Sequence, residues 1–261
     1  MRFLTIAAAL LLAAAPAAAQ SPAVKFSLDW ILQGQQAPFL LGQEKGYYAA
    51  DGVNLAAVDA GRGSSDTIGR IANGVYEIGF GDLSSLIEFN AKNPGKEMIA
   101  VAMIYDQAPF AIVSLKKHGI SKPADLKGKK GASPSFDSTY RLFNVFAKVN
   151  GLDPASMTWA NVAPQLREPM LARGETEAIA ALKAREPLTN EGVELQRLTM
   201  AFEFIATENT KRNGLGDVDP ARLQKNIDLV TEGFQLPRKI PAELVFDRSY
   251  LAPAAERRIG G

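Results

Sequence analysis

The order of its hydrophobic patterns is the feature of this chain that most restricts its fold. Short apolar segments with the character of strands, such as 53–58 and 77–80, alternate with segments that have the character of helices, such as 83–91. Apolar runs of this length suit buried strands, and their alternation with helices is typical of parallel sheets. The pattern therefore predicts an α/β fold.

The full set of expected elements follows from the same periodicities. The expected strands are 24–30, 53–58, 77–80, 98–104, 110–115, 130–133, 157–162 and 177–180. The expected helices are 83–91, 138–149, 165–173 and 220–234, with one more ended by Gly46 and another following 61–65. A further helix, over 189–204, is expected only from the resemblance given below. A helix, a glycine and a strand recur in the same order at 68–80 and 171–179. This echo predicts two lobes built from like units.

The N-terminus indicates an exported protein. A single positive charge at Arg2 precedes a run over 3–15 that is apolar except for Thr5, Pro16 ends the run, and three alanines follow. This is the arrangement of a cleavable signal peptide, here 1–19 with cleavage before Gln20. The alternative, a membrane anchor, is disfavoured because the run is shorter than the ~20 residues that span a bilayer. We therefore expect a periplasmic location.

The composition excludes several classes of site. The 261 residues contain no Cys and one His, His118, and 29 basic residues nearly balance 28 acidic ones. Disulfides, thiolate nucleophiles, cysteine metal sites and histidine-based triads are therefore excluded. The balanced charge gives no sign of a surface that binds nucleic acid. We expect no metal, no cofactor and no nucleic-acid partner, and we interpret His118 as a solvated turn residue.

A series of short motifs gives the chain a family resemblance. In chain order they are Leu28-Asp29-Trp30, Gln36-Ala37-Pro38-Phe39, Lys45-Gly46-Tyr47-Tyr48, Gly61-Arg62-Gly63-Ser64-Ser65, Gly79-Phe80-Gly81-Asp82, Gly119-Ile120, Pro123-Ala124-Asp125-Leu126-Lys127-Gly128-Lys129 and Asn150-Gly151-Leu152-Asp153. In this order they resemble the NMT1/THI5-like periplasmic substrate-binding proteins of ABC importers, which bind nitrate, sulfonates, taurine and thiamine pyrimidine precursors. The resemblance covers almost the whole chain after the expected signal peptide. It implies two α/β lobes, joined by two crossing strands, that close on a ligand and dock on a membrane permease.

The resemblance also implies a domain organisation and a missing segment. It assigns 20–112 to the first lobe, 113–181 to the second, and 182–261 to a helical segment that packs back on the first lobe. In the family, a strand like 177–180 is followed by several dozen residues that complete the second lobe and cross back, whereas here the helical tail follows at once. We expect a monomer with a periplasmic-binding-protein-like (type II) fold and an incomplete second lobe and hinge. The alternative is that the tail helices pack directly over the shortened second lobe.

Candidate ligand contacts in the first lobe lie after strands or at helix starts. Trp30 follows a strand, where its ring can stack on a planar ligand or pack in the core or hinge. Gln36 stands where the family often has His, so it keeps hydrogen-bonding capacity without a titratable role. Gly63, Ser64 and Ser65 open a helix, where N–H groups and hydroxyls can bind an anion or polar group, although an ordinary N-cap is the alternative.

Further candidates come from later in the chain. Asp82 can accept a hydrogen bond from a ligand amine or cap the next helix. Phe110, at the start of the first crossing strand, can line the cleft, although a core role is more typical. In the second lobe, the resemblance places Ser135, Asp137 and Ser138 before a helix that faces the cleft, and an N-cap role accounts for at least one of them.

Three functions remain open on this evidence. The resemblance favours an extracytoplasmic solute-binding protein that passes a small polar, aromatic or anionic molecule to a permease. A degenerate or regulatory relative that folds without transporting is the alternative. A thiamine-pyrimidine-synthase-like enzyme is the third, but the related enzymes use His and Cys chemistry that this chain lacks. We therefore expect no enzymatic activity.

Overall fold

A computed structural model describes residues 21–182 and 191–259. The strands are β1 (Val24–Ser27), β2 (Leu55–Asp59), β3 (Ile78–Gly79), β4 (Phe110–Val113), β5 (Lys130–Ser133), β6 (Thr158–Asn161) and β7 (Ala178–Leu182). The helices are α1 (Ala37–Glu44), α2 (Tyr47–Ala50), α3 (Ser64–Ala72), α4 (Leu83–Lys92), α5 (Ser138–Arg141), α6 (Phe143–Val149), α7 (Arg167–Arg173), α8 (Glu191–Ile205), α9 (Glu208–Asn213) and α10 (Pro220–Gly233). The predicted signal peptide and the predicted start of the helical tail at 183–188 lie outside the described residues.

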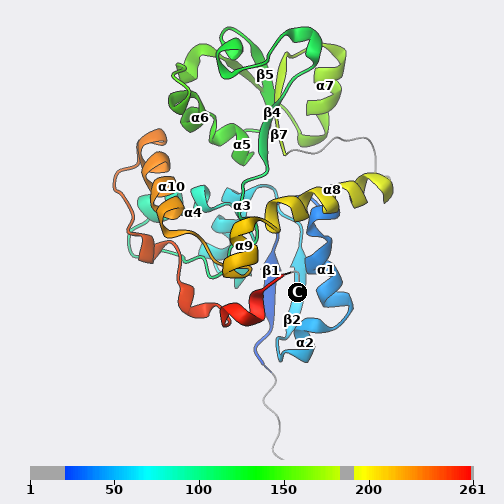
Figure 1. Ribbon diagram of the computed structural model, residues 1–261, viewed down its shortest axis with the longest axis vertical. Coiled ribbons are helices and arrows are strands. Elements are labelled where there is room, and N and C mark those ends of the chain that lie inside the picture. The colour runs from blue at the N-terminus through cyan, green and yellow to red at the C-terminus, as the bar shows by residue number, and fades with distance from the viewer. Residues whose placement is uncertain (1–20, 183–190, 260–261) are drawn as a thin grey trace, which may run out of the picture.

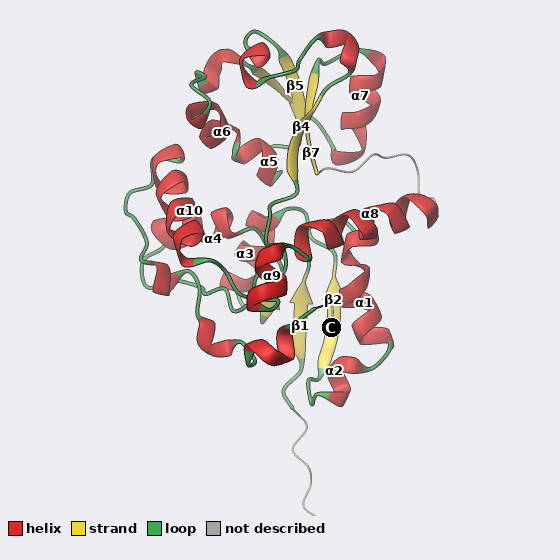
Figure 2. Cartoon of the chain, viewed as in Figure 1, coloured by secondary structure: helices red, strands yellow, loops and turns green. Residues whose placement is uncertain are grey.

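The strands form two separate sheets. The first sheet has the order β2-β1-β3 and is parallel throughout. The second has the order β4-β7-β5-β6, in which β5 is parallel to β6 and β7, and β4 is antiparallel to β7. Each sheet and the helices beside it form a separate body, and Figures 1 and 2 show the two bodies one above the other. The predicted α/β fold class is confirmed.

We name the two bodies by their sheets. The first lobe contains the β2-β1-β3 sheet with α1 to α4, and the second lobe contains the β4-β7-β5-β6 sheet with α5 to α7. Figure 1 shows α8, α9 and α10 with the first lobe. The chain enters the second lobe along β4, and its antiparallel partner β7 runs back, with Leu182 opposite Phe110.

The largest hydrophobic core joins the C-terminal residues to the first lobe. Helix α10 begins at Pro220 because the Asp219 side chain caps it by accepting from the Arg222 N–H at 2.9 Å. Its buried face packs against α3 and α4 in one cluster. The buried members are Ile68, Leu86, Ile87, Ala91, Leu223, Ile227, Val230, Ile240, Val245 and Phe246. The predicted apolar stripe of α10 is therefore a core stripe, with Phe234 at its partly buried end.

The predicted strand over 98–104 is wrong. In its place the chain makes only two isolated bridges, Ala100 to Phe246 and Met103 to Gly216. The buried Asn90 side chain bonds both backbone groups of Met98, donating to its carbonyl at 2.8 Å and accepting from its N–H at 3.0 Å. These bonds satisfy backbone groups that a sheet ladder would otherwise use.

The predicted helix over 138–149 is divided in two at Leu142, between α5 and α6. Leu142 has φ −78° and ψ −4°, which departs from a regular α-helix. Its side chain packs against the hydrophobic core of the first lobe. The division therefore coincides with a contact between the lobes that the helical periodicity alone does not show.

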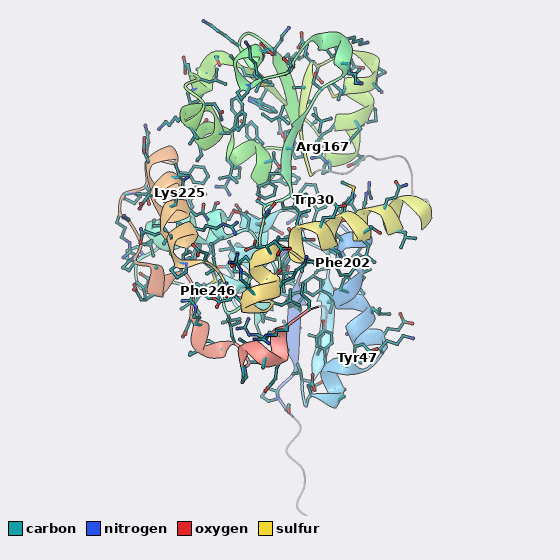
Figure 3. All side chains as sticks on the ribbon, viewed as in Figure 1. Trp30, Tyr47, Arg167, Phe202, Lys225 and Phe246 are labelled. Atoms are coloured by element: carbon teal, nitrogen blue, oxygen red, sulfur yellow. The ribbon has the colours of Figure 1, made fainter. Side chains whose placement is uncertain are left out.

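No helix within residues 21–182 and 191–259 combines the length and apolarity needed to cross a bilayer. The longest of them, α8, has 15 residues. Several of its side chains are exposed, including Leu195 and Phe202. Figure 3 shows Phe202 on this helix beside the first lobe.

The core role of α10 predicts a difference between two leucine truncations. Leu223 is 4% exposed in the core of the first lobe, whereas Leu195 on α8 is 62% exposed. Leu223→Ala should lower the free energy of unfolding by about 2–5 kcal/mol, because it leaves a cavity in a packed core. Leu195→Ala should change it by about 0.5 kcal/mol or less. Urea unfolding of both variants measures this difference, and equal effects would contradict the assignment of the C-terminal residues to this core.

Candidate functional site

A cavity of ≈ 570 Å³ lies between the two lobes. Its polar lining follows the carboxyl ends of parallel strands: Asp29 comes after β1, Asp82 after β3 and Asp137 after β5. Parallel strands present their carboxyl ends at one edge of a sheet, where ligands of open α/β folds bind. Each lobe turns this edge toward the other, so groups far apart in the sequence meet in the cavity.

Asp82 makes hydrogen bonds to several polar residues of both lobes at the cavity. Its carboxylate caps α4 by accepting from the Ser85 N–H at 2.9 Å and from the Ser85 hydroxyl at 2.7 Å. Ser138 of the second lobe donates its hydroxyl to the same carboxylate at 2.6 Å. The Asp82 N–H in turn donates to Ser64 Oγ at 2.9 Å. Asp82 therefore ties together the starts of three helices from both lobes, α4 and α5 through its carboxylate and α3 through its backbone N–H.

Asp29 has a buried carboxylate oxygen that faces no donor. Its Oδ1 is shielded from solvent and has no hydrogen-bond partner among the described residues. Burial raises the pKa of Asp29 to about 7, and the negative charge of Asp82 adds to this rise. Bonds from its own backbone and from the Gln36 side chain oppose it. The carboxylate can thus accept a hydrogen bond or a proton from a molecule in the cavity.

Aromatic rings wall the cavity on the side of the first lobe. Phe26 and Phe39 have ring centroids 5.2 Å apart, Phe39 and Phe80 5.3 Å, and Phe80 and Tyr105 5.8 Å. Burial, together with the charge of Asp29, raises the pKa of Tyr105 to about 12. Its phenol is therefore a neutral hydrogen-bond donor at ordinary pH.

Trp30 of the first lobe, on the cavity wall, lies near Arg167 of the second lobe, which is outside the wall. The Trp30 ring lies 6.0 Å from Phe136 and 5.9 Å from the Arg167 guanidinium, and Figure 3 shows Trp30 at the boundary with Arg167 above it. Arg167 pairs with Asp137 at 2.9 Å, and both side chains are buried. Burial raises the pKa of Asp137, while the charge of Arg167 opposes the rise. Asp137 also caps α5 by accepting from the Thr139 N–H at 2.8 Å.

Gly63 permits the closest approach of the two lobes. It has φ +120°, and a Cβ at this position would lie 2.8 Å from the Phe136 carbonyl oxygen. Any side chain here would push the lobes apart or strain the backbone. The glycine therefore serves lobe contact as well as the start of α3.

The structure places eight of the ten predicted site residues on the cavity wall. These eight are Trp30, Gln36, Gly63, Ser64, Asp82, Phe110, Asp137 and Ser138. The wall does not include the other two. Ser65 Oγ lies 3.3 Å from Ser85 Oγ on the side of the first lobe, and Ser135 is exposed with its N–H bonded to Asn161 at 2.8 Å.

Sequence reasoning missed Asp29, Phe39, Phe80, Tyr105 and Arg167. Asp29 could have been predicted, because it precedes Trp30 after the first strand and belongs to a motif that carries the family resemblance. The side chains of Phe39 and Phe80 were in quoted motifs too. Arg167 gave no signal, because its role depends on Asp137, 30 residues earlier in the chain.

The lining of the cavity is acidic. Its acidic members are Asp29, Glu77, Asp82, Asp106, Asp137 and Asp217, and its one basic member is Arg222, which pairs with Asp106 at 2.8 Å. Across the parts of the chain that the structure describes, no ion pair forms on Asp29 or Asp82. No three His, Asp or Glu side chains in those parts gather to hold a metal ion. The free charge in the cavity is therefore negative.

The raised pKa of Asp29 predicts a pH-dependent stability difference. Because folding raises this pKa from 3.8 to about 7, the folded protein binds the proton more tightly. The resulting stabilisation is present below about pH 4 and is lost as the pH rises through about 7. Asp29→Asn should remove this dependence. Its free energy of unfolding relative to wild type should therefore rise between pH 4 and pH 8, by more than the ~1.4 kcal/mol of one pKa unit. A difference that stays constant across this range would contradict the assignment.

The ion pair between Arg167 and Asp137 predicts unequal effects of two substitutions on α7. Arg167→Met removes the partner of a buried carboxylate and should lower the free energy of unfolding by about 3–5 kcal/mol. Arg173→Met, on the same helix, breaks an exposed pair with Glu175 and should lower the free energy of unfolding far less, because solvent screens an exposed pair. Denaturant unfolding of both variants measures the difference. Similar decreases in the free energy of unfolding would contradict the burial of the pair between Arg167 and Asp137.

Comparison with known proteins gives relatives of two kinds. A 4-amino-5-hydroxymethyl-2-methylpyrimidine phosphate synthase of Legionella pneumophila is 26% identical over 134 residues, covering 51% of this chain and 41% of the relative. The riboflavin-binding protein RibY of Chloroflexus aurantiacus is 25% identical over 228 residues, covering 84% of this chain and 63% of the relative. The chain thus spans between about two fifths and two thirds of the length of these relatives.

Solved structures support the fold. A putative sulfonate ABC transporter periplasmic sulfonate-binding protein, SsuA, from Methylobacillus flagellatus has a TM-score of 0.55 at 15% identity, covering 91% of this chain and 94% of that one. The alkanesulfonate-binding protein SsuA from Xanthomonas axonopodis pv. citri, bound to MOPS, has a TM-score of 0.50 at 14% identity, covering 87% and 83%. The predicted two-lobed periplasmic-binding-protein-like fold is confirmed.

The relatives also correct one prediction and confirm another. The expectation of no enzymatic activity is contradicted, because the relatives from Legionella pneumophila and Schizosaccharomyces pombe are both named as a pyrimidine phosphate synthase. The lack of Cys and the single His were not sufficient to exclude an enzyme. The predicted family resemblance is confirmed by the family model described as NMT1/THI5 like, which matches residues 33–232. The chain belongs to the NMT1/THI5-like family.

Proposed function

We propose that this chain is an extracytoplasmic solute-binding protein that captures a small, planar, nitrogen-bearing molecule between its lobes. It then delivers this molecule to the permease of an ABC importer. The family supports this role, and so do the structural neighbours, which are named as binding proteins of sulfonate importers. The arrangement of the N-terminal residues supports export. The observation that carries the proposal is the unpartnered Asp29 oxygen beside Asp82 in the cavity between the lobes.

The size and closure of the cavity suit a small molecule. Its volume of ≈ 570 Å³ lies within the ~300–1,000 Å³ of small-molecule sites. Ser138 bonds Asp82 across it, and Arg141 of the second lobe pairs with Glu88 of the first. Opening of the lobes would break these contacts, so they favour a closed form that surrounds a ligand.

The chemistry of the lining favours a donor-bearing planar ligand. Aromatic side chains that line a cavity bind flat molecules well. Asp29 and Asp82 are acceptors whose charges no described basic side chain pairs with, so they would repel an anion and attract N–H groups. A sulfonate would meet negative charge where it needs donors. The sulfonates named for the structural neighbours are therefore a poor match to this cavity.

A ligand panel tests the proposal through thermal unfolding of the chain from Gln20. Benzamidine and 4-amino-5-hydroxymethyl-2-methylpyrimidine should raise the unfolding temperature, because a ligand at 100 times its Kd adds about 2.7 kcal/mol to the folded state. Benzenesulfonate and ethanesulfonate should leave it unchanged. Asp29→Asn should abolish the shift, whereas the exposed control Asp51→Asn should keep it.

Two results would count against this proposal. A shift with the sulfonates alone would show that the cavity selects anions. The absence of any shift, in a protein that unfolds cooperatively, would favour a degenerate relative that folds without binding these solutes. Uptake by cells that carry the gene with its neighbouring permease genes would then decide whether the chain serves transport.

A second candidate function is synthesis of a pyrimidine phosphate, as named for two curated relatives. The favouring observation is the pKa of Asp29, about 7, because a group that titrates near neutrality can move a proton at a reacting molecule. Incubation of the purified chain with candidate precursors, followed by mass spectrometry, tests this function. A pyrimidine phosphate formed by wild type and not by Asp29→Asn would support it.

A further inference from the structure

The cavity that contains Asp29 and Asp82 also extends along a free edge of the first sheet. Strand β3 pairs with β1 on one side only, and within the described residues no strand pairs with its other side. The cavity wall includes the whole of this edge, from Glu77 to Phe80. An edge strand is normally paired, covered or charged. Here it borders the cavity, and Ile78 on it remains exposed.

A second segment, residues 98–106, lines the same cavity without pairing with β3. Residues 98–106 belong to the cavity wall, and their isolated bridges run to Phe246 and Gly216 rather than to β3. Ile78 on β3 and Ile99 on this segment are each 40% exposed, although both line the cavity. Two apolar side chains on the cavity wall are thus left uncovered.

The surroundings of these two side chains are apolar. We call this part of the wall the β3-edge chamber, and its members are Ile71, Ile78, Met98, Ile99, Val101 and Ile104. The ionisable group on the same edge is Glu77, whose carboxylate accepts from the Lys25 N–H at 2.7 Å and so is engaged. Apolar surface that borders a cavity gains stability when a ligand covers it.

We propose that the cavity binds an amphipathic molecule, with a planar nitrogen-bearing head at Asp29 and Asp82 and an apolar tail in the β3-edge chamber. This inference rests on the proposed function, which supplies the head. It adds a second subsite within the same cavity, lined by residues that no polar ligand would use. The tail is linear or branched hydrocarbon, since the chamber offers no free donor or acceptor side chain.

A small molecule fits this chamber better than an extended peptide. Strand β3 has only two residues, whereas added strands normally pair over about five. The chamber is also continuous with the carboxylates, because one cavity contains both. A single ligand therefore reaches from the Asp29 carboxylate to Ile99.

Isothermal titration with two matched series of probes tests the tail and the head separately. The first series is benzamidine with its 4-butyl and 4-hexyl derivatives, and the second is benzenesulfonate with the same two tails. Each buried methylene should tighten binding about three- to four-fold. The 4-butyl benzamidine should therefore bind on the order of a hundred-fold tighter than benzamidine. The sulfonates should bind weakly at every tail length.

A polar substitution in the chamber locates the tail. Ile99→Asn should remove most of the gain from the butyl tail while leaving the affinity for benzamidine itself unchanged. The matched control is Ile31→Asn, because Ile31 is 42% exposed and is not part of the cavity wall; it should keep the full gain. Ile99→Thr, which retains the branched shape, serves if Ile99→Asn fails to fold by circular dichroism.

The outcomes separate this inference from the proposed function. If benzamidine binds and the tails add nothing, the β3-edge chamber is not a subsite, while the proposed function stands. A tail gain that survives Ile99→Asn and Ile99→Thr would place the tail elsewhere and overturn the inference as well. Equal gains in the sulfonate series would overturn the assignment of the head. If none of the probes binds, both the proposed function and this inference fail.

Discussion

The hydrogen bond from Ser138 to Asp82 is the interaction on which the arrangement of the site depends. It joins the start of a helix in the second lobe to a carboxylate that also caps a helix in the first. The same carboxylate raises the pKa of Asp29 through its charge. The contact between the lobes, the N-cap of α4 and the charge in the cavity thus all depend on the Asp82 carboxylate. Any ligand that alters the hydrogen bonds of Asp82 will also alter the balance between open and closed lobes.

The organisation of the first lobe explains the shape of the cavity. The C-terminal residues fill the core beside α3 and α4, so this face of the sheet is well packed. Within the described residues they add no strand to the edge of β3, and residues 98–106 make only isolated bridges, to Phe246 and Gly216. The space beside the edge therefore joins the cleft between the lobes. The domain boundaries at 112 and 181 remain predictions.

Local rules predicted much of the fold and less of the site. Periodicity and capping rules correctly predicted the N-cap at Asp219, the buried stripe of α10, and strand β5. Short-range chemistry determines all three features. The strand expected over 98–104 failed because the Asn90 side chain, from the preceding helix α4, takes the backbone groups of Met98. Asp29 was missed because its raised pKa arises from tertiary burial and from Asp82, which no local pattern reports. Ser135 was included because position before a helix does not show which way a side chain faces.

We propose that Asp29 is a buried hydrogen-bond acceptor and that the ligand supplies its donor. The measurement that tests it most directly is a carbon-detected NMR titration of the Asp29 carboxyl group, with and without benzamidine. We predict a pKa of about 7 in the free protein, and a markedly lower pKa in the complex, because a cationic donor stabilises the carboxylate. An Asp29 that titrates near its ordinary value of 3.8 in the free protein, or whose pKa does not change with the ligand, would contradict the account.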